Sequence, residues 1–321
     1  MAINTITYAQ LLMSSLDEAA VRDAVTGWMD ANAGQVKYNG GNEVKVPQMS
    51  TQGMADYDRD DGYVQGAITL AWKTLTMTQD RGRKFQIDAM DVDETAFVPT
   101  AAAIMGTFQR TQVIPEIDAY RLSKLASVAI TAAVAGMVQY GQTISAATST
   151  LRKIKEGIKA VREQGYNEAL VIHANDDTVM ELELELSGHL RSETWSLGGV
   201  NTQVPVVDNV PIIPTPANRM YTAIAINDGT TEGQKDGGYA KGESGLDANF
   251  IVVPRTVPLA ITKQDVMRIF DPMTNQKANA WGIDYRRYHD LWVLDNKKGS
   301  IYVSIKDAAQ GATGATGATQ G

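Results

Sequence analysis

The sequence predicts an α+β fold that combines a long β-hairpin, a long helix and a layered α/β unit. Residues Trp72–Met90 alternate hydrophobic side chains with Thr, Gln, Arg and Asp, which is the period-two pattern of half-buried strands. Pro115 then opens a run in which leucines and alanines recur at helical spacing. Farther along, residues 143–213 change from a helical pattern to a strand, a helix and further strands, as in a compact layered domain.

Length and composition indicate a globular protein with two or three compact units. The chain has 321 residues, enough for more than one hydrophobic core. Its 44% hydrophobic and 21% charged residues are ordinary for such proteins. No apolar run reaches the length of about 18 residues that a membrane helix needs, so we expect no membrane partner. Asn4, Thr5 and Gln10 interrupt any apolar start, so we expect no signal peptide.

No residue pattern indicates catalysis, a cofactor or a metal. The chain has no cysteine, which excludes thiol nucleophiles and thiolate metal ligands and suits assembly in a cytoplasm. Its three histidines lack ligand spacing, and no G-x-S-x-G motif occurs. His173 lies in an apolar strand pattern and is expected in the core. The net charge is −8 with scattered Lys and Arg, whereas a nucleic-acid reader normally shows a basic patch.

The first third of the chain is expected to contain a helix and two long antiparallel arms. Hydrophobic spacing within residues 1–33 predicts a helix that Gly34 ends. Its apolar face docks either on its own domain or on a neighbouring subunit. A strand is expected at Glu43–Val46, and residues 43–95 read as two arms around an exposed tip at Met54–Gly66. Asp80–Gly82 supplies turn residues for a hairpin.

Two acidic clusters lie on these arms. Asp56, Asp58 and Asp60 have the spacing of a calcium loop. Asp61 and Ala67 stand where that loop needs Gly and Glu, so a solvated tip is expected. The second cluster is Asp88, Asp91, Asp93 and Glu94. A metal, plain solvation, or ion pairs within or between subunits could satisfy it, and we favour ion pairs because neighbouring side chains of a strand point to opposite faces.

The middle of the chain predicts three helices and a buried strand. The long helix runs from Pro115 to Gly136 or Gly141, and Glu116 and Asp118 in its first turn suit the helix dipole. Residues 143–164 predict a second helix that ends at Gly165. The strand Glu168–His173 follows. Asn175–Asp177 then caps a helix over Thr178–Leu190, although Glu181–Leu186 alternates as a strand would.

The last third predicts strands around one polar loop. Residues 227–249 are Gly-rich but lack the spacing of phosphate-binding loops, so a flexible surface loop is expected. The tail at 311–319 repeats Gly-Ala-Thr, and we expect it to be disordered. The expected strands are Val204–Val207 and Pro211–Ile213 around an Asp208–Asn209 turn, then Phe250–Val253, Val257–Ile261, Trp281–Val293 and Ser300–Ser304, with a turn at Asn296–Gly299.

Several stretches resemble the major capsid proteins of tailed bacteriophages, which share the Hong Kong 97-type fold. They are Thr76–Arg81, FQIDAMDVDE at Phe85–Glu94, PEIDAYRLSKLA at Pro115–Ala126, and YRRYHDLWVL followed by GSIYV near the C-terminus. The resemblance covers nearly all of residues 36–305. It implies an N-terminal arm (1–42), an extended loop (43–98), a peripheral domain with a spine helix (99–142 and 254–300), an axial domain (143–253 and 301–306) and a tail (307–321).

The resemblance implies a head protein that forms hexamers and pentamers of an icosahedral or prolate shell around phage DNA. A separate scaffold, portal and decoration proteins are implied partners, the packaged DNA is contacted weakly, and the shell forms in the host bacterial cytoplasm. The alternatives are an encapsulin-like nanocompartment shell and a soluble enzyme or binding domain. The expected subunit-contact residues are Asp58, Arg59, Asp60, Trp72, Arg81, Arg83, Lys84, Asp88, Asp91, Asp93, Glu94, Arg110, Glu116, Asp118 and Arg121.

Overall fold

The computed structural model describes residues 24–35, 41, 43–60, 62–88, 104–145, 147–187, 189–197, 200–275 and 279–309. Most of the predicted N-terminal helix, the acidic residues Asp91, Asp93 and Glu94, and the Gly-Ala-Thr tail lie outside these residues. Residues 27–35, at the end of the predicted N-terminal helix, form the 3-10 helix η1 (Gly27–Gln35) and no α-helix. No described helix is long and apolar enough to cross a membrane.

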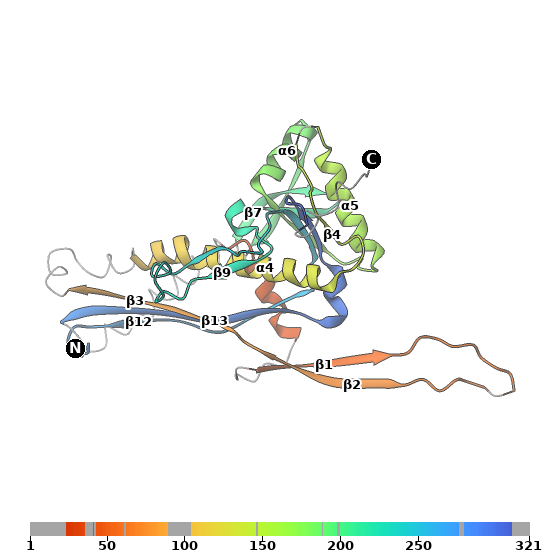
Figure 1. The fold of residues 1–321 in the computed structure, drawn as a ribbon, viewed down its shortest axis with the longest axis horizontal. Helices are drawn as coiled ribbons and strands as arrows, with labels where there is room; N and C mark the ends of the chain where they lie inside the picture. Colours follow the sequence, from red (N-terminus) through yellow and green to blue (C-terminus); the bar gives the residue numbers. More distant parts are fainter. Residues whose placement is uncertain are drawn as a thin grey trace, which may run out of the picture.

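A seven-stranded sheet carries the two largest hydrophobic clusters, one on each face. β14 with β4 and β5 with β8 are parallel pairs, and the other pairs are antiparallel. The helices α5 (Thr150–Glu163) and α6 (Asp176–Leu186) cover one face (Figure 1). In order across the sheet, the strands are β4 (Val138–Gln139), β14 (Tyr302–Ile305), β11 (Ala248–Pro254), β5 (Leu170–Asn175), β8 (Val210–Thr215), β7 (Val200–Val207) and β6 (Arg191–Leu197).

Local sequence signals set the ends of these elements. Ser149 caps α5 and Asn175 caps α6, each accepting a hydrogen bond from a backbone N–H of the first turn. The predicted helix at Thr178–Leu190 is confirmed with slightly shifted ends, so the strand-like Glu-Leu alternation is overridden. Asp208 and Asn209 both have positive φ (52° and 62°). These values suit the tight turn between β7 and β8, as the sequence predicted.

The long helix begins earlier than predicted. Residues 104–108 are already α-helical, a π-helical turn η2 follows at Gln109–Val113, and α4 continues over Ile114–Ala132. Pro115 therefore does not start the helix. It has no N–H for the carbonyl of Thr111, and its ring crowds that carbonyl. The wide π turn just before the proline accommodates it. The helix ends at Ala133, in the left-handed conformation, before either predicted glycine.

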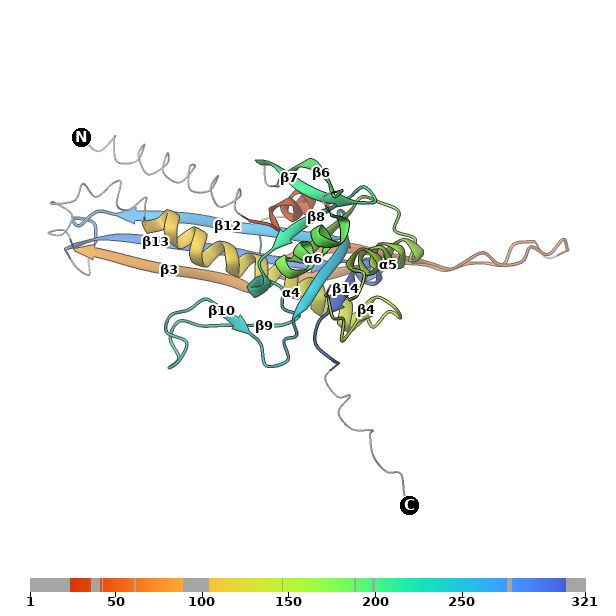
Figure 2. The same cartoon turned by 90° about the horizontal axis from the view of Figure 1, so that it is seen from above.

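A three-stranded antiparallel sheet runs alongside this helix. Its order is β12 (Pro258–Phe270), β13 (Ala280–Val293) and β3 (Gln79–Asp88) (Figure 2). The turn predicted at Asp80–Gly82 is wrong, because these residues continue β3. Asp80 accepts hydrogen bonds from the guanidinium of Arg286 on β13 (2.5 and 2.8 Å). A Cβ on Gly82 would lie 2.7 Å from the carbonyl oxygen of Tyr285, so close strand packing explains this glycine.

The remaining elements are a projecting hairpin and short connections. β1 (Glu43–Thr51) pairs with β2 (Ile68–Thr76), and the hairpin extends away from the body with residues 52–60 and 62–67 at its tip (Figure 1). The antiparallel arms and the tip are thus confirmed. The second arm is shorter than predicted, because the chain after β2 continues as β3, which pairs with β13 instead of β1.

The predicted loop 227–249 includes part of a ribbon, β9 (Ile224–Ile226) with β10 (Tyr239–Lys241). The 3-10 helix η3 spans Ala217–Arg219, and η4 (Asp295–Ser300) replaces the predicted Asn296–Gly299 turn.

The contact at Gly82 generates a stability prediction. We expect Gly82→Ala to lower the free energy of unfolding by about 1–3 kcal/mol, because the new methyl group meets a backbone oxygen that a rotamer change cannot move. Gly53→Ala is the matched control, since nothing lies within 4 Å of a Cβ there. The measurement is the urea unfolding midpoint of the unassembled subunit. Equal midpoints for the two variants would contradict the assignment.

Candidate functional site

The hairpin exposes an apolar stripe on one of its faces. Met49, Ile68, Leu70 and Trp72 are between 61% and 73% exposed. Leu70 lies opposite Met49 in the register, and Ile68 and Trp72 follow at two-residue steps, so all four point to one side. Exposed apolar side chains that gather in one place mark interaction surfaces. Trp72 is therefore exposed on such a surface, and its role in a subunit contact stays a prediction.

The tip of the hairpin adds exposed aromatic groups. The rings of Tyr57 and Tyr63 meet edge to face with centroids 4.9 Å apart, and both side chains are exposed. Asp58 Oδ1 accepts a hydrogen bond from the backbone N–H of Asp60 (2.8 Å). Arg59 lies between them, and all three predicted contact residues are on the surface. Among the described residues, no three acidic or histidine side chains converge as metal ligands.

The base of the hairpin is fixed to the body. Val44 and Val46 are buried in a cluster with Met77 and Trp292, on the face opposite the apolar stripe. Lys73 Nζ lies 2.6 Å from Asp295 Oδ2. These contacts fix where the hairpin leaves the body.

A buried carboxylate holds the junction between β2 and β3. Asp290 Oδ2 accepts hydrogen bonds from the backbone N–H and hydroxyl of Thr78 (2.8 and 3.0 Å). Asp290 Oδ1 accepts one from Tyr120 Oη (2.6 Å). Burial, and then the Asp290 carboxylate, raise the pKa of Tyr120, so the phenol stays a donor. The long helix therefore holds the point where the chain passes from the hairpin into the sheet.

Two predicted contact residues form an ion pair within the chain. Arg81 Nε and Nη2 donate to Glu116 (2.7 and 3.1 Å), and Arg81 Nη1 donates to the carbonyl of Asn227 (2.8 Å). Glu116 therefore pairs with a strand residue, and the predicted first-turn role is wrong because the helix already begins by residue 104. Arg83, next but one on β3, donates to the carbonyl of Lys235 (3.2 and 3.3 Å).

A cavity of about 100 Å³ lies beside this pair, between β3, β13, the long helix and the 227–238 loop. Two of the charged groups that line it are in ion pairs: Arg81 with Glu116, and Arg287, whose Nη1 lies 2.7 Å from Asp265. Burial, and then the nearby arginines, lower the pKa of His289 well below its ordinary value, so its ring is neutral. We find no described nucleophile with an activating base at this cavity, and Arg81 and Arg83 hold the loop through its carbonyls.

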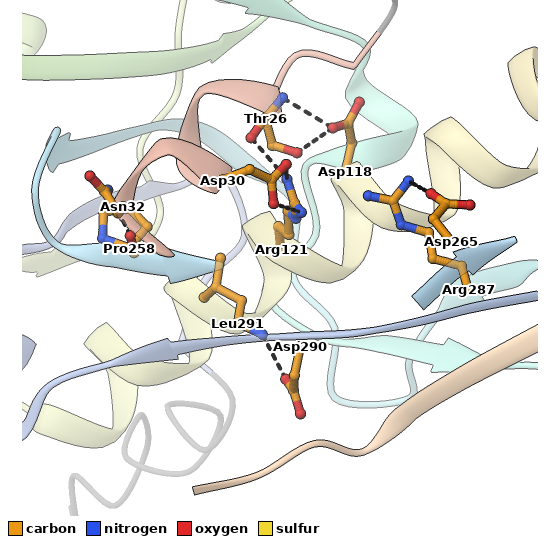
Figure 3. A network of polar contacts seen from close by, with 10 residues as sticks. All are labelled: Thr26, Asp30, Asn32, Asp118, Arg121, Pro258, Asp265, Arg287, Asp290 and Leu291. Carbon is orange, nitrogen blue, oxygen red and sulfur yellow. Dashed lines mark hydrogen bonds and ion pairs between the residues drawn. The ribbon is translucent and has the colours of Figure 1, made fainter. Parts of the chain in front are cut away.

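Asp118 and Arg121 lie in the interior and bind the N-terminal segment (Figure 3). Asp118 accepts hydrogen bonds from the backbone N–H groups of Val25 (3.2 Å) and Thr26 (3.1 Å), and from Arg219 Nη1 (2.9 Å). Arg121 donates to both carboxylate oxygens of Asp30 (2.6 and 3.0 Å). Their exposures of 0% and 1% correct the expectation that these two side chains contact a neighbouring subunit.

His173 and Asn32 complete the attachment of residues 24–35. Trp28 Nε1 donates to His173 Nε2 (3.2 Å), and the two rings stack. The side-chain amide of Asn32 donates to the carbonyls of Arg255 and Pro258 (2.7 and 2.8 Å). His173 is fully buried, which confirms its predicted place in the core. The described start of the chain is thus packed on its own body.

The other predicted residues lie at the surface or outside the description. Lys84 is exposed with Nζ 3.9 Å from Asp284, and Arg110 is exposed in the π turn. Asp88 ends β3. Sequence reasoning missed Asp30, Arg219 and Asp290, whose partners lie 91, 101 and up to 212 residues away. No local pattern could have identified them.

The Asp118 contacts generate a second prediction. We expect Asp118→Asn to destabilise the subunit by about 3 kcal/mol, because Arg219 loses its buried counter-charge and an amide N–H₂ faces backbone donors. Asp60→Asn at the exposed hairpin tip should change stability by less than about 0.5 kcal/mol. Urea unfolding of both variants measures the difference. A loss below about 1 kcal/mol for Asp118→Asn would show that the network does not hold the segment.

Burial of His173 predicts a pH dependence of stability. Burial lowers its pKa to about 3, below the ordinary value of about 6.5. The unfolded chain therefore binds a proton that the folded chain does not, and stability falls as the pH drops from about 6.5 toward 3. Between about pH 7 and pH 5, the parent should lose about 2 kcal/mol relative to His173→Gln. Urea unfolding of both proteins at each pH measures this difference. If the free energies of unfolding of the parent and of His173→Gln fall by the same amount, the prediction is contradicted.

Comparisons with known proteins identify the fold. No protein-family model and no curated protein matches the sequence. Among solved structures, the mature capsid of bacteriophage PhiM1 is similar at 9% identity, with a TM-score of 0.55 over 83% of this chain and 82% of that one.

Two further structures match over a similar extent. A chain of Mycobacterium phage Che8 has 12% identity and a TM-score of 0.53, over 84% of this chain and 86% of that one. The capsid of Ralstonia phage GP4 has 8% identity and a TM-score of 0.50, over 84% and 85%. The chain has the tailed-phage major capsid protein fold, as the sequence resemblance implied.

Proposed function

We propose that this chain is the major capsid protein of a tailed-phage head. One observation carries the proposal: on a capsid fold, a hairpin fixed at its base projects from the body and exposes four large apolar side chains on one face. Such a face suits a neighbouring copy of the same chain. Burying one of these side chains contributes about 1.5–3 kcal/mol, and a closed shell engages many such contacts at once.

The parts of the fold suit distinct roles in this assembly. The hairpin serves as the extended loop, the long helix with β3, β12 and β13 as the peripheral domain, and the seven-stranded sheet with α5 and α6 as the axial domain that forms rings. The net charge of −8 suits a shell that contacts packaged DNA weakly. A separate scaffold, a portal and decoration proteins are further proposed partners, and the host cytoplasm is the proposed place of assembly.

Electron microscopy of the expressed chain tests this function. We expect rings of five or six copies, or closed shells, and the shells of the intact phage should contain DNA. A chain that remains a monomer or dimer in light scattering would contradict the proposal. Particles that enclose a specific protein and no nucleic acid would favour the nanocompartment alternative.

Two substitutions on β2 test the hairpin itself. We expect Leu70→Asp to reduce the particle yield at least tenfold while the subunit stays folded, because the side chain is exposed in the subunit but loses its apolar contact in the shell. Thr69→Asp is the matched control. Its neighbouring position points to the opposite face and is also exposed, so particles should still form. Normal assembly of Leu70→Asp would exclude the stripe as a contact.

A further inference from the structure

The helix α6 has apolar side chains on the side that faces away from its core. Thr178, Val179 and Leu182 are buried against the sheet. Met180 and Leu184, one turn apart, are 52% and 65% exposed on the opposite side. A helix that only covered a sheet would carry polar residues there. The outward face of α6, which carries Met180 and Leu184, is therefore a candidate contact surface.

Acidic residues surround this apolar pair. Of the 11 residues of α6, five are Asp or Glu, and none is Lys or Arg. Glu185 is used inside the subunit, where it accepts hydrogen bonds from the Ser149 hydroxyl and the Leu151 N–H. None of the ion pairs between described residues involves Asp177, Glu181 or Glu183. An apolar centre with an acidic rim is complementary to basic, partly aliphatic side chains.

The neighbouring helix α5 presents such side chains. Five Lys or Arg residues and two Glu residues lie along its 14 positions. The side chains of Arg152 and Lys159 are 80% and 72% exposed, and their only ion pairs among described residues are with Glu156 and Glu163 on the same helix. Exposed pairs of this kind contribute little. The long aliphatic stems of Lys and Arg can cover Met and Leu while their charges reach carboxylates.

The two helices lie beside each other on the same face of the seven-stranded sheet (Figures 1 and 2). One unit of the fold therefore carries both an acidic surface with an apolar centre and a basic surface. Two different complementary surfaces on one chain support a head-to-tail contact, and repeated head-to-tail contacts with a closing rotation produce rings. Charge complementarity would also set which surfaces meet.

We propose that the outward face of α6, formed by Asp177, Met180, Glu181, Glu183 and Leu184, binds the basic face of α5 in a second copy of this chain. This inference rests on the proposed shell function and names the surfaces that join neighbouring copies within a ring. The partner is another copy because the same fold presents the complementary charge beside the acidic helix.

Reciprocal charge reversal tests the contact. Glu181→Lys with Glu183→Lys should reduce the yield of rings and particles at least tenfold, and so should Arg152→Glu with Lys159→Glu. The chain that carries all four substitutions should recover most of the yield, because the charges are exchanged and complementarity returns. Size-exclusion chromatography with light scattering measures assembly, and thermal unfolding checks that each subunit remains folded. Glu185 is left unchanged because it caps α5.

A control pair separates a specific contact from a change in total charge. Glu232→Lys with Glu243→Lys changes the total charge by the same amount, at two exposed glutamates outside α6. This variant should leave assembly unchanged. Assembly of the α6 variant at the parental yield, or failure of the fourfold variant to recover, would overturn the inference while the shell function stands. A parent chain that forms no rings or particles would overturn both.

Discussion

The body of the subunit depends on two charged residues buried one turn apart on the long helix. A buried charge without a partner costs several kcal/mol, so Asp118 and Arg121 require groups from elsewhere in the chain. The backbone of Val25 and Thr26, the carboxylate of Asp30 and the guanidinium of Arg219 supply them. Satisfying these two residues brings η1 and the segment before β9 onto the helix, and positions the rest of the body around it.

A second buried carboxylate connects this body to the hairpin. Asp290 joins Thr78, between β2 and β3, to Tyr120 on the same long helix. The hairpin base therefore cannot shift without breaking contacts in the core, whereas the outer part of the paired strands extends away from the body (Figure 1). A hairpin with a fixed base and an exposed apolar face suits contact with other copies of the chain better than cover for a sheet of its own body.

The sequence predicted helices, strands and turns well where nearby residues determine them. Its predictions failed where residues distant in sequence determine the conformation or the contact. The cap at Asn175 and the Asp208–Asn209 turn act within a few residues, and both predictions are confirmed. Asp80–Gly82 reads as a turn in isolation, but pairing with β13 keeps it extended. Asp118 reads as a first-turn acid, yet its partners lie about a hundred residues away. Alternation predicted the arms, but no pattern shows that Leu70 and Trp72 remain exposed.

Exposure of these side chains has a further physical consequence. An isolated two-stranded hairpin is only marginally stable in water, and a third strand or a packed face is needed to support it. β1 and β2 form a two-stranded sheet of their own, and only their base is buried. Contact with a neighbouring copy would supply the missing packed face and would cover the apolar stripe in the same step. On the proposed function, order in the outer hairpin and association between copies would therefore be coupled, because one buried surface would serve both.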